Sequence, residues 1–507
     1  MDALEDELRA VAPEALEPGS EAALTQAFLL EVLAGERGHR AVRPELWRVS
    51  GTFNAWPSEL ATLAQLQPVA TPRDREAALA RFAEVPGFIE RERRNLEEGL
   101  AGGWTAVRAN VLAALRQLDA LLSAPPEASP FVRMGEGGDE AFRTRLLRLE
   151  EGELRPAIAR FRSWLAERYL PSAPDEGGMA ALPGGEGAYR AAIRKWATVE
   201  RAPEEVHALG LERMERIRGE MAELSARSFG GRPPEELLEA LRTEPEFLLG
   251  GRDELLRIAR DAVDRAERAL PLWFGRVPLA PVEVRPVPDF AEASAPAAYY
   301  TAPEEGSGRP GIYHLNLRDA ERQPLAGVES TAFHEAHPGH HTQLSLARET
   351  PGIHPVRQLL FLSGFGEGWA LYSERLSDEM GLFTSDIDRM GLLSNEALRA
   401  TRLIVDTGLH ALGWTRAEAI ACMRANTTED PASIEAEVNR YLAVPGQAVS
   451  YMLGCVEVEA LRARAEAALG EAFDLPAFHD ALLGEGALPL DELDTQSAEN
   501  ALRDPVL

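Results

Sequence analysis

A mainly helical fold with a small element of edge strands is predicted by the 507-residue sequence. Over most of the chain, hydrophobic residues recur at intervals of three or four, which is the period of an amphipathic helix. Two short aromatic segments bounded by Gly or Pro interrupt this pattern, and such segments are typical of strands. The composition, 45% hydrophobic and 27% charged, indicates a folded protein large enough for more than one domain.

The helical pattern is clearest in four segments of the first half of the chain. Loops rich in Pro, Gly and Ser separate these segments. After the strand-like region the pattern returns at Leu325 and continues nearly to the end. The predicted helical segments of the first half are residues 75–103, 104–123, 204–228 and 254–274.

The strand-like segments follow a change in character after about residue 275. A Pro-punctuated extended stretch, residues 277–290, precedes PAAYYTAP (296–303) and GIYHLNL (311–317). Pro-bounded strands belong at sheet edges, because proline cannot donate to the ladder of hydrogen bonds. We therefore expect a helical N-terminal region, residues 1–275, and a second region of edge strands and helices, residues 276–507, with a soft boundary between them.

The charge balance excludes several classes of protein. Asp and Glu total 82 against 53 Lys and Arg, so the formal net charge is −29, which disfavours nucleic-acid and membrane partners. The sequence contains no run of about 18 apolar residues, and its acidic start does not resemble a signal peptide. The two cysteines, Cys422 and Cys455, are expected as free thiols in a cytoplasmic protein. The sequence does not indicate an oligomeric state.

Four of the ten histidines lie within eight residues, in ESTAFHEAHPGHHTQ. A structural zinc site would favour cysteines, and none is near. A metal-ligand histidine followed by glutamate can present that carboxylate to a metal-bound water. We therefore predict a catalytic zinc site with His334 as a ligand and Glu335 as general base. The alternatives are histidines on a helix surface and a purely structural metal site.

The second ligand depends on the residue four positions after His334, which is Pro338. Proline inside a helix removes a donor and clashes with the preceding turn, so the helix is expected to bulge or break around Pro338 and Gly339. If two residues are looped out, His340 becomes the second ligand. In an unbroken helix His341 would instead share the face of His334. We favour His340 and keep His341 as the alternative.

The segment GFGEGWALYSERL, residues 364–376, offers a third ligand, Glu367. It is similar to the Glu-Gly-Phe-Ala segment from which aminopeptidase N and its relatives take their third zinc ligand. Otherwise Glu367 is an acidic residue at the start of an amphipathic helix. Glu374 lies on the same helix face and is expected either to orient a ligand histidine or to be an exposed glutamate.

Hydrolysis at zinc needs a further group to stabilise the oxyanion, usually a Tyr, His or Arg across the cleft. Three segments offer candidates: RATRLIVDTGLHALGW, VNRYLAVPGQAVSYMLG and PAAYYTAP. We predict His410 and Tyr451 as catalytic residues. An edge strand beside the zinc helix would also bind an extended peptide by β-augmentation. For each tyrosine the alternative is a core aromatic residue. The predicted substrate-binding residues are Tyr300, Arg440, Tyr441 and Gln447.

Four motifs together, FHEAHPGHHTQ, GEGWALYSERL, VDTGLHALGW and RYLAVPGQAVSY, resemble a large bacterial family known as domain of unknown function 885 (DUF885). That family is grouped with the gluzincin-type zinc peptidases, and the resemblance is clearest over residues 295–455. It implies a zincin-like helical body with a deep substrate channel, similar in architecture to carboxypeptidase Taq, the thimet-type oligopeptidases and angiotensin-converting enzyme. The family usually has another residue at the position of His337, so His337 is not expected to be a ligand.

The sequence thus predicts a cytoplasmic zinc metallopeptidase whose substrate is a peptide. His334, His340 and Glu367 would hold Zn²⁺, and Glu335 would act as general base. Residues 276–507 would then be the catalytic region. The alternatives are a zinc-dependent amidase or deacylase that acts on a small metabolite, and a non-catalytic binding protein that retains the metal. The sequence does not distinguish endopeptidase from exopeptidase action.

Overall fold

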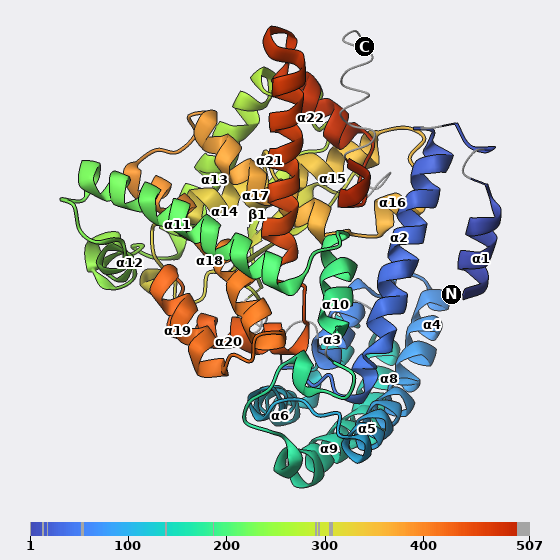
Figure 1. Ribbon diagram of the computed structural model, residues 1–507. Coiled ribbons are helices and arrows are strands. Elements are labelled where there is room, and N and C mark those ends of the chain that lie inside the picture. Colours follow the sequence, from blue (N-terminus) through green and yellow to red (C-terminus); the bar gives the residue numbers. More distant parts are fainter. Residues whose placement is uncertain are drawn as a thin grey trace.

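The computed structural model describes residues 2–493 except for 13–14, 18, 52–54, 137–138, 186, 289–291, 293–294 and 304–307. It is 70% helix and 4% strand, which confirms the predicted mainly helical class with a small sheet. Helices from residues 85–164 gather at one end of the molecule, and the helix of residues 21–41 runs away from them along one side (Figure 1). The helices that follow the sheet form the other end, with α10 between the two.

The helices before the sheet depart from the predicted segments mainly at prolines. The segment predicted over 75–103 is two helices, α4 and α5, because Pro86 opens a new helix where the first one ends. The segment predicted over 204–228 is one helix, as expected. The helices are α1 (Asp2–Ala10), α2 (Glu21–Ala41), α3 (Trp56–Leu66), α4 (Pro72–Ala83), α5 (Val85–Gly102), α6 (Arg108–Ser123), α7 (Pro130–Arg133), α8 (Glu140–Leu149), α9 (Arg155–Trp164), α10 (Ala188–Ala197), α11 (Pro203–Ser228), α12 (Pro234–Thr243) and α13 (Arg252–Ala269).

The described sheet has the strand order β1 (Val282–Pro286), β3 (Gly311–Leu315), β2 (Ala298–Thr301). β3 pairs in parallel with β1 and antiparallel with β2. The expectation that both aromatic strands lie at an edge is therefore wrong for β3, which is central. The reason is that Pro310 lies just before β3, where its missing N–H removes no bond from the ladder.

The helices after the sheet carry every residue predicted to bind a metal. They are joined by short connections, and one of these is the break at Pro338 that the sequence predicts. The helices are α14 (Val328–Glu335), α15 (His340–Glu349), α16 (Pro355–Leu359), α17 (Ser363–Glu379), α18 (Asp386–His410), α19 (Arg416–Asn426), α20 (Pro431–Ala443), α21 (Ser450–Leu469) and α22 (Leu475–Gly484).

Two large hydrophobic cores account for most of the buried apolar residues. The larger core draws on residues from Leu24 to Leu493 and contains the tight packing of α17 on α21 and of α11 on α18. The second core, from Val49 to Ala173, lies among the N-terminal helices. The larger core combines residues from both sides of position 275, and the proposed division at that position stays a prediction.

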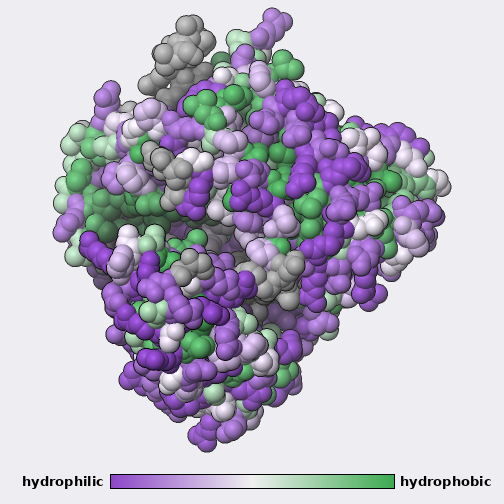
Figure 2. Space-filling view, turned by 180° about the vertical axis from the view of Figure 1, so that it is seen from behind, coloured by the Kyte–Doolittle hydropathy of each residue, from purple (hydrophilic) through white to green (hydrophobic). Residues whose placement is uncertain are grey.

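The surface agrees with the acidic, mixed composition. Figure 2 shows hydrophilic side chains over most of one face, with hydrophobic side chains in separate patches. Among the described helices, none is both long enough and apolar enough to cross a lipid bilayer.

Candidate metal centre

The connection between α14 and α15 is held in a sharp bend. Helix α14 ends at Glu335, the His337–Pro338 peptide bond is cis, and α15 begins at His340. The indole Nε1–H of the buried Trp369 donates to the carbonyl oxygen of Pro338 at 3.0 Å. A Cβ on Gly339 would lie 1.9 Å from the carbonyl oxygen of His334, so only glycine fits at this close approach.

This bend brings the three predicted metal ligands together. The ligand atoms of His334, His340 and Glu367 all lie within 4.8 Å of one another. Both Nε2 atoms are 3.4 Å from Oε2 of Glu367. The two imidazole rings are nearly perpendicular, with their centroids 4.8 Å apart. Two imidazole nitrogens and one carboxylate oxygen form a donor set that suits Zn²⁺ with one coordination position left open.

Glu374 fixes the orientation of His334. Its Oε1 is 2.9 Å from Nδ1 of His334, and its Oε2 accepts a hydrogen bond from the hydroxyl of Ser330. Because a carboxylate accepts hydrogen bonds, Nδ1 carries a hydrogen, and Nε2 is directed at Glu367, where it could bind a metal after losing its own proton. Burial lowers the pKa of His334, but its bonds to Glu367 and Glu374 outweigh burial and raise it to about 9. The same contacts hold the pKa of Glu367 well below its usual range despite its burial.

Glu335, the predicted general base, is buried beside these ligands. Burial raises its pKa, and the neighbouring His340 and His334 oppose the rise. Burial raises the pKa of Tyr313 on β3, and the charge of the nearby Glu335 raises it further. The hydroxyl of Tyr313 is buried and has no hydrogen-bond partner among the described residues. The central strand therefore supplies a neutral O–H group close to Glu335.

His341 belongs to a different set of contacts. Its Nε2 lies 3.0 Å from the carbonyl oxygen of Ala280, so Nε2 donates, and Nδ1 accepts from the hydroxyl of Tyr300 at 2.7 Å. Burial lowers the pKa of His341 to about 4, consistent with a neutral ring. His337 is also buried, and its Nδ1 lies 2.9 Å from Oγ1 of Thr342. The predicted substrate-binding residue Tyr300 thus contacts His341 from the edge strand β2.

Glycines in the GFGEGWA motif allow α17 and α21 to cross closely beside Glu367. A Cβ on Gly368 would lie 2.4 Å from the carbonyl carbon of Gly454, and a Cβ on Gly454 would lie 1.8 Å from the carbonyl oxygen of Gly364. Tyr451 lies one turn before Gly454 on α21. Burial, together with the charge of Glu367, raises the pKa of Tyr451 to about 12. The predicted catalytic tyrosine is therefore a protonated donor whose pKa responds to the charge of the third ligand.

Three further predicted residues form a connected network with Tyr451. Gln447 lies close enough to Tyr451 to oppose the rise in the tyrosine pKa, and its Oε1 accepts from the guanidinium of Arg440. Arg440 donates to both carboxylate oxygens of Glu437, at 2.8 and 2.9 Å. The hydroxyl of Tyr441 donates to the same carboxylate at 2.7 Å. The structure thus groups Arg440, Tyr441 and Gln447 around Tyr451. Tyr300 belongs to the separate set of contacts around His341.

His410 has both ring nitrogens bonded to backbone groups. Nδ1 accepts from the N–H of Met179 and Nε2 donates to the carbonyl oxygen of Tyr441, each at 3.0 Å. Its ring stacks on Tyr189, whose hydroxyl donates to Asp406 at 2.6 Å. These bonds join α18 to α10 and α20. A catalytic role for His410, which would require one of its bonds to break, stays a prediction.

Sequence reasoning missed three residues that lie around the centre: Tyr313, Arg399 and Arg402. Nη2 of Arg399 is 3.7 Å from Oε1 of Glu374, and Arg402 lies over the ring of Tyr451 with its Cζ 4.6 Å from the centroid. Both arginines are on α18, at the start of the segment RATRLIVDTGLHALGW, from which only His410 was predicted as a site residue. Only the packing of α18 against the ligand helices brings them to this place.

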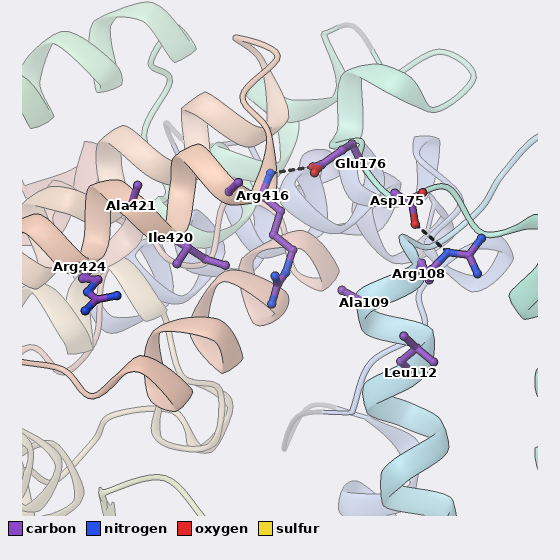
Figure 3. A pocket seen from close by; sticks show the side chains of 10 residues that line it. Arg108, Ala109, Leu112, Asp175, Glu176, Arg416, Ile420, Ala421 and Arg424 are labelled. Carbon is purple, nitrogen blue, oxygen red and sulfur yellow. Dashed lines mark hydrogen bonds and ion pairs between the residues drawn. The ribbon is translucent and has the colours of Figure 1, made fainter.

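A surface hollow elsewhere on the molecule contains none of the predicted site residues. It lies between α6 and α19 (Figure 3). Within it the Nε–H of Arg108 donates to Asp175, and the backbone N–H of Arg416 donates to Glu176, each at 2.7 Å. Both acidic side chains of the lining are thus already hydrogen bonded inside the protein, and the hollow supports no functional assignment.

The fold and the site define a mainly helical protein that holds two histidines and a glutamate together. The family described as "Bacterial protein of unknown function (DUF885)" matches residues 1–496, so the chain belongs to that family. No curated protein matches the chain.

Two solved structures are similar to the chain. One is the crystal structure of the "putative lipoprotein" from Colwellia psychrerythraea, with a TM-score of 0.88 and 27% identity over 99% of this chain and 91% of that one. The other is a "putative lipoprotein of unknown function" from Shewanella oneidensis, with a TM-score of 0.76 and 19% identity over the same shares. The second likeness shows the fold alone.

Proposed function

We propose that this protein is a zinc-dependent hydrolase that cleaves peptide bonds, most readily in oligopeptides. The observation that carries the proposal is the grouping of His334, His340 and Glu367 beside a second buried glutamate, Glu335. A histidine–histidine–glutamate donor set suits catalytic zinc. When bound, Zn²⁺ supplies a Lewis acid that activates water and polarises a carbonyl group.

The protein's own residues would perform the proton transfers. Glu335 would take a proton from the attacking water and deliver it to the nitrogen of the leaving amine, while a C–O bond forms and the C–N bond breaks. One water is consumed for each bond cleaved. Burial raises the pKa of Glu335, which favours a base able to return the proton near neutral pH.

Glu374 supports this proposal because it holds His334 with Nε2 directed at Glu367. A gluzincin-type relationship and a deep substrate channel are part of the same proposal. The gluzincin-type relationship is supported by two ligands from one broken helical segment and a third, a glutamate, from α17. The cytoplasmic location stays a prediction from the sequence.

Turnover of a mixed oligopeptide library tests the proposal. We expect the zinc-loaded protein to cleave peptides, a chelator to stop cleavage, and restored zinc to recover it. Glu335→Gln should retain zinc and lose at least about 10²-fold in kcat, the usual scale for a general base. Cleavage of small acylated metabolites instead of peptides would favour an amidase or deacylase. Zinc binding with no turnover of either would favour a binding protein.

A further inference from the structure

Two arginines of α18, the half-buried Arg399 and the buried Arg402, and the buried Arg440 of α20 lie near the candidate metal centre. Arg402 donates from Nε to the hydroxyl of Tyr441 at 3.0 Å and from Nη2 to Glu437 at 2.9 Å. Arg440 uses the same carboxylate of Glu437. Arg399 lies one turn before Arg402 on the same face of the helix. The function proposed above gives none of these three arginines a part in the hydrolysis.

This network has an excess of positive charge. Arg402 and Arg440 share the single negative charge of Glu437. Burial raises the pKa of Glu437, but the two arginines outweigh burial and hold it well below its usual range, so this carboxylate is ionised. Glu429 also faces the network, and burial and the charge of Glu437 raise its pKa, which favours its neutral form. Arg399 in turn faces Glu374. A further anion would therefore be attracted to Arg402 and Arg440.

Two donors of these arginines have no acceptor. Nη1 of Arg402 and Nε of Arg399 are buried without a hydrogen-bond partner among the described residues. The side chain of Arg402 is 9% exposed and that of Arg399 is 12% exposed. A buried donor without an acceptor raises the free energy of the folded protein, and a charged donor raises it more than a neutral one. The two unpaired donors therefore indicate that a ligand supplies an acceptor at this place.

The position of these donors relates them to the metal ligands. The guanidinium of Arg402 lies 4.6 Å above the ring of Tyr451, which is near enough to Glu367 for the charge of that glutamate to affect it. Arg399 lies 3.7 Å from Glu374, the residue that orients His334. The arginines with free donors thus contact Tyr451 of α21 and Glu374 of α17.

We infer that Arg402, assisted by Arg399, binds a carboxylate of the substrate beside the metal centre, and that the substrates are peptides cleaved near a free C-terminus. Arginine binds carboxylates in a planar, bidentate geometry that suits this recognition. Because the donors are buried, the end of a chain reaches them more readily than the middle. The inference rests on the proposed hydrolase function, and it adds exopeptidase-type recognition of the chain end.

The test compares three peptides: one with a free C-terminal acid, the C-terminal amide of the same sequence, and that amide with one internal residue replaced by glutamate. Their binding to the zinc-loaded Glu335→Gln protein is measured by calorimetry, so that turnover does not interfere. We expect the free acid to bind about 10- to 100-fold more tightly than the amide, the range expected for hydrogen bonds between charged groups.

Variants assign this preference to the arginine. In the same background, Arg402→Gln should abolish the preference for the acid while zinc content is unchanged, and Arg402→Lys should retain part of it. Arg399→Gln, at a more exposed position, serves if Arg402→Gln does not fold. The matched control is Arg213→Gln, which removes an arginine that pairs with Glu459 at 2.6 Å and should leave the preference intact.

The outcomes separate this inference from the proposed function. Equal binding of acid and amide peptides would overturn the carboxylate site, even if the wild-type protein cleaves both. Tight binding of the glutamate-containing amide alone would keep a carboxylate site and overturn its assignment to the C-terminus. A preference for the acid without cleavage of any peptide by the wild-type protein would support the site and contradict the hydrolase function.

Discussion

The ring nitrogens of two adjacent histidines differ in what they contact. His341 uses Nε2 on the carbonyl oxygen of Ala280 and Nδ1 on the hydroxyl of Tyr300. His340 directs Nε2 toward Glu367, and its Nδ1 is buried without a hydrogen-bond partner among the described residues. Only His340 therefore offers a nitrogen for a metal at the position of the cluster.

Single alanine substitutions test this difference. We expect His340→Ala to lose bound zinc, because it removes one of three donors. His341→Ala should retain about one equivalent, since both of its nitrogens already serve the protein. Metal analysis of the dialysed variants decides between them. Loss of zinc in His341→Ala alone would show that the break at Pro338 does not select the ligand.

Much of the centre could be predicted from local sequence, because its histidines and glutamates stand in short motifs. Pro338 at the fourth position after His334 was enough to predict the break and to favour His340. Arg399 and Arg402 stand in one of the three segments that offered candidates, but the sequence did not single them out. Their roles depend on which face of a long buried helix meets the centre, and tertiary packing decides that.

At the level of the elements, α17, which carries Glu367, crosses closely over α21, which carries Tyr451. The crossing depends on glycines whose backbones touch, and small residues at such a contact let helices approach closely. The glycines of GFGEGWA therefore have a packing function as well as marking a ligand.

Gly368→Ala is expected to destabilise the protein by about 1–3 kcal/mol, the usual cost of overpacking. The added Cβ would lie 2.4 Å from the backbone of Gly454, which cannot move aside as a flexible side chain could. Gly219→Ala in α11 is the control, because nothing lies within 4 Å and the helix should gain up to about 1 kcal/mol. Urea unfolding measures both, and equal stability of the two variants would contradict the crossing.

The same elements show where a periodic pattern is reliable. The uninterrupted pattern of residues 204–228 became one helix, whereas the pattern of 75–103 continued through Pro86 and concealed a helix end. The central place of β3 could not be predicted, because strand order depends on pairing between segments that are distant in the sequence.

At the scale of the whole molecule, several histidines are buried in neutral form in the interior. His479 accepts from the hydroxyl of Tyr372 at 3.0 Å and donates to the carbonyl oxygen of Trp273 at 2.9 Å. Burial lowers its pKa to about 4 from 6.5. Burial likewise lowers the pKa of His39 to about 4. Protonation of either group therefore favours the unfolded chain.

We expect stability to fall as the pH falls from about 6.5 to about 4, since the unfolded chain takes up protons that the folded protein excludes. Above pH 6.5 the contribution of His479 is fully present, and below 6.5 it is lost progressively, by about 3 kcal/mol at most. Urea unfolding across this range should show a shallower pH dependence for His479→Gln than for the wild type. Identical slopes would mean that His479 is protonated in the folded state.

The overall account depends on a metal held by residues from two separate helical segments. The measurement that tests it most directly is the zinc content of the dialysed wild-type protein and of Glu367→Ala. We predict about one equivalent of zinc per wild-type chain and a large loss in Glu367→Ala, because this carboxylate lies 3.4 Å from Nε2 of both histidines. Full retention of zinc in Glu367→Ala, or no zinc in a wild-type protein offered the metal, would contradict the account.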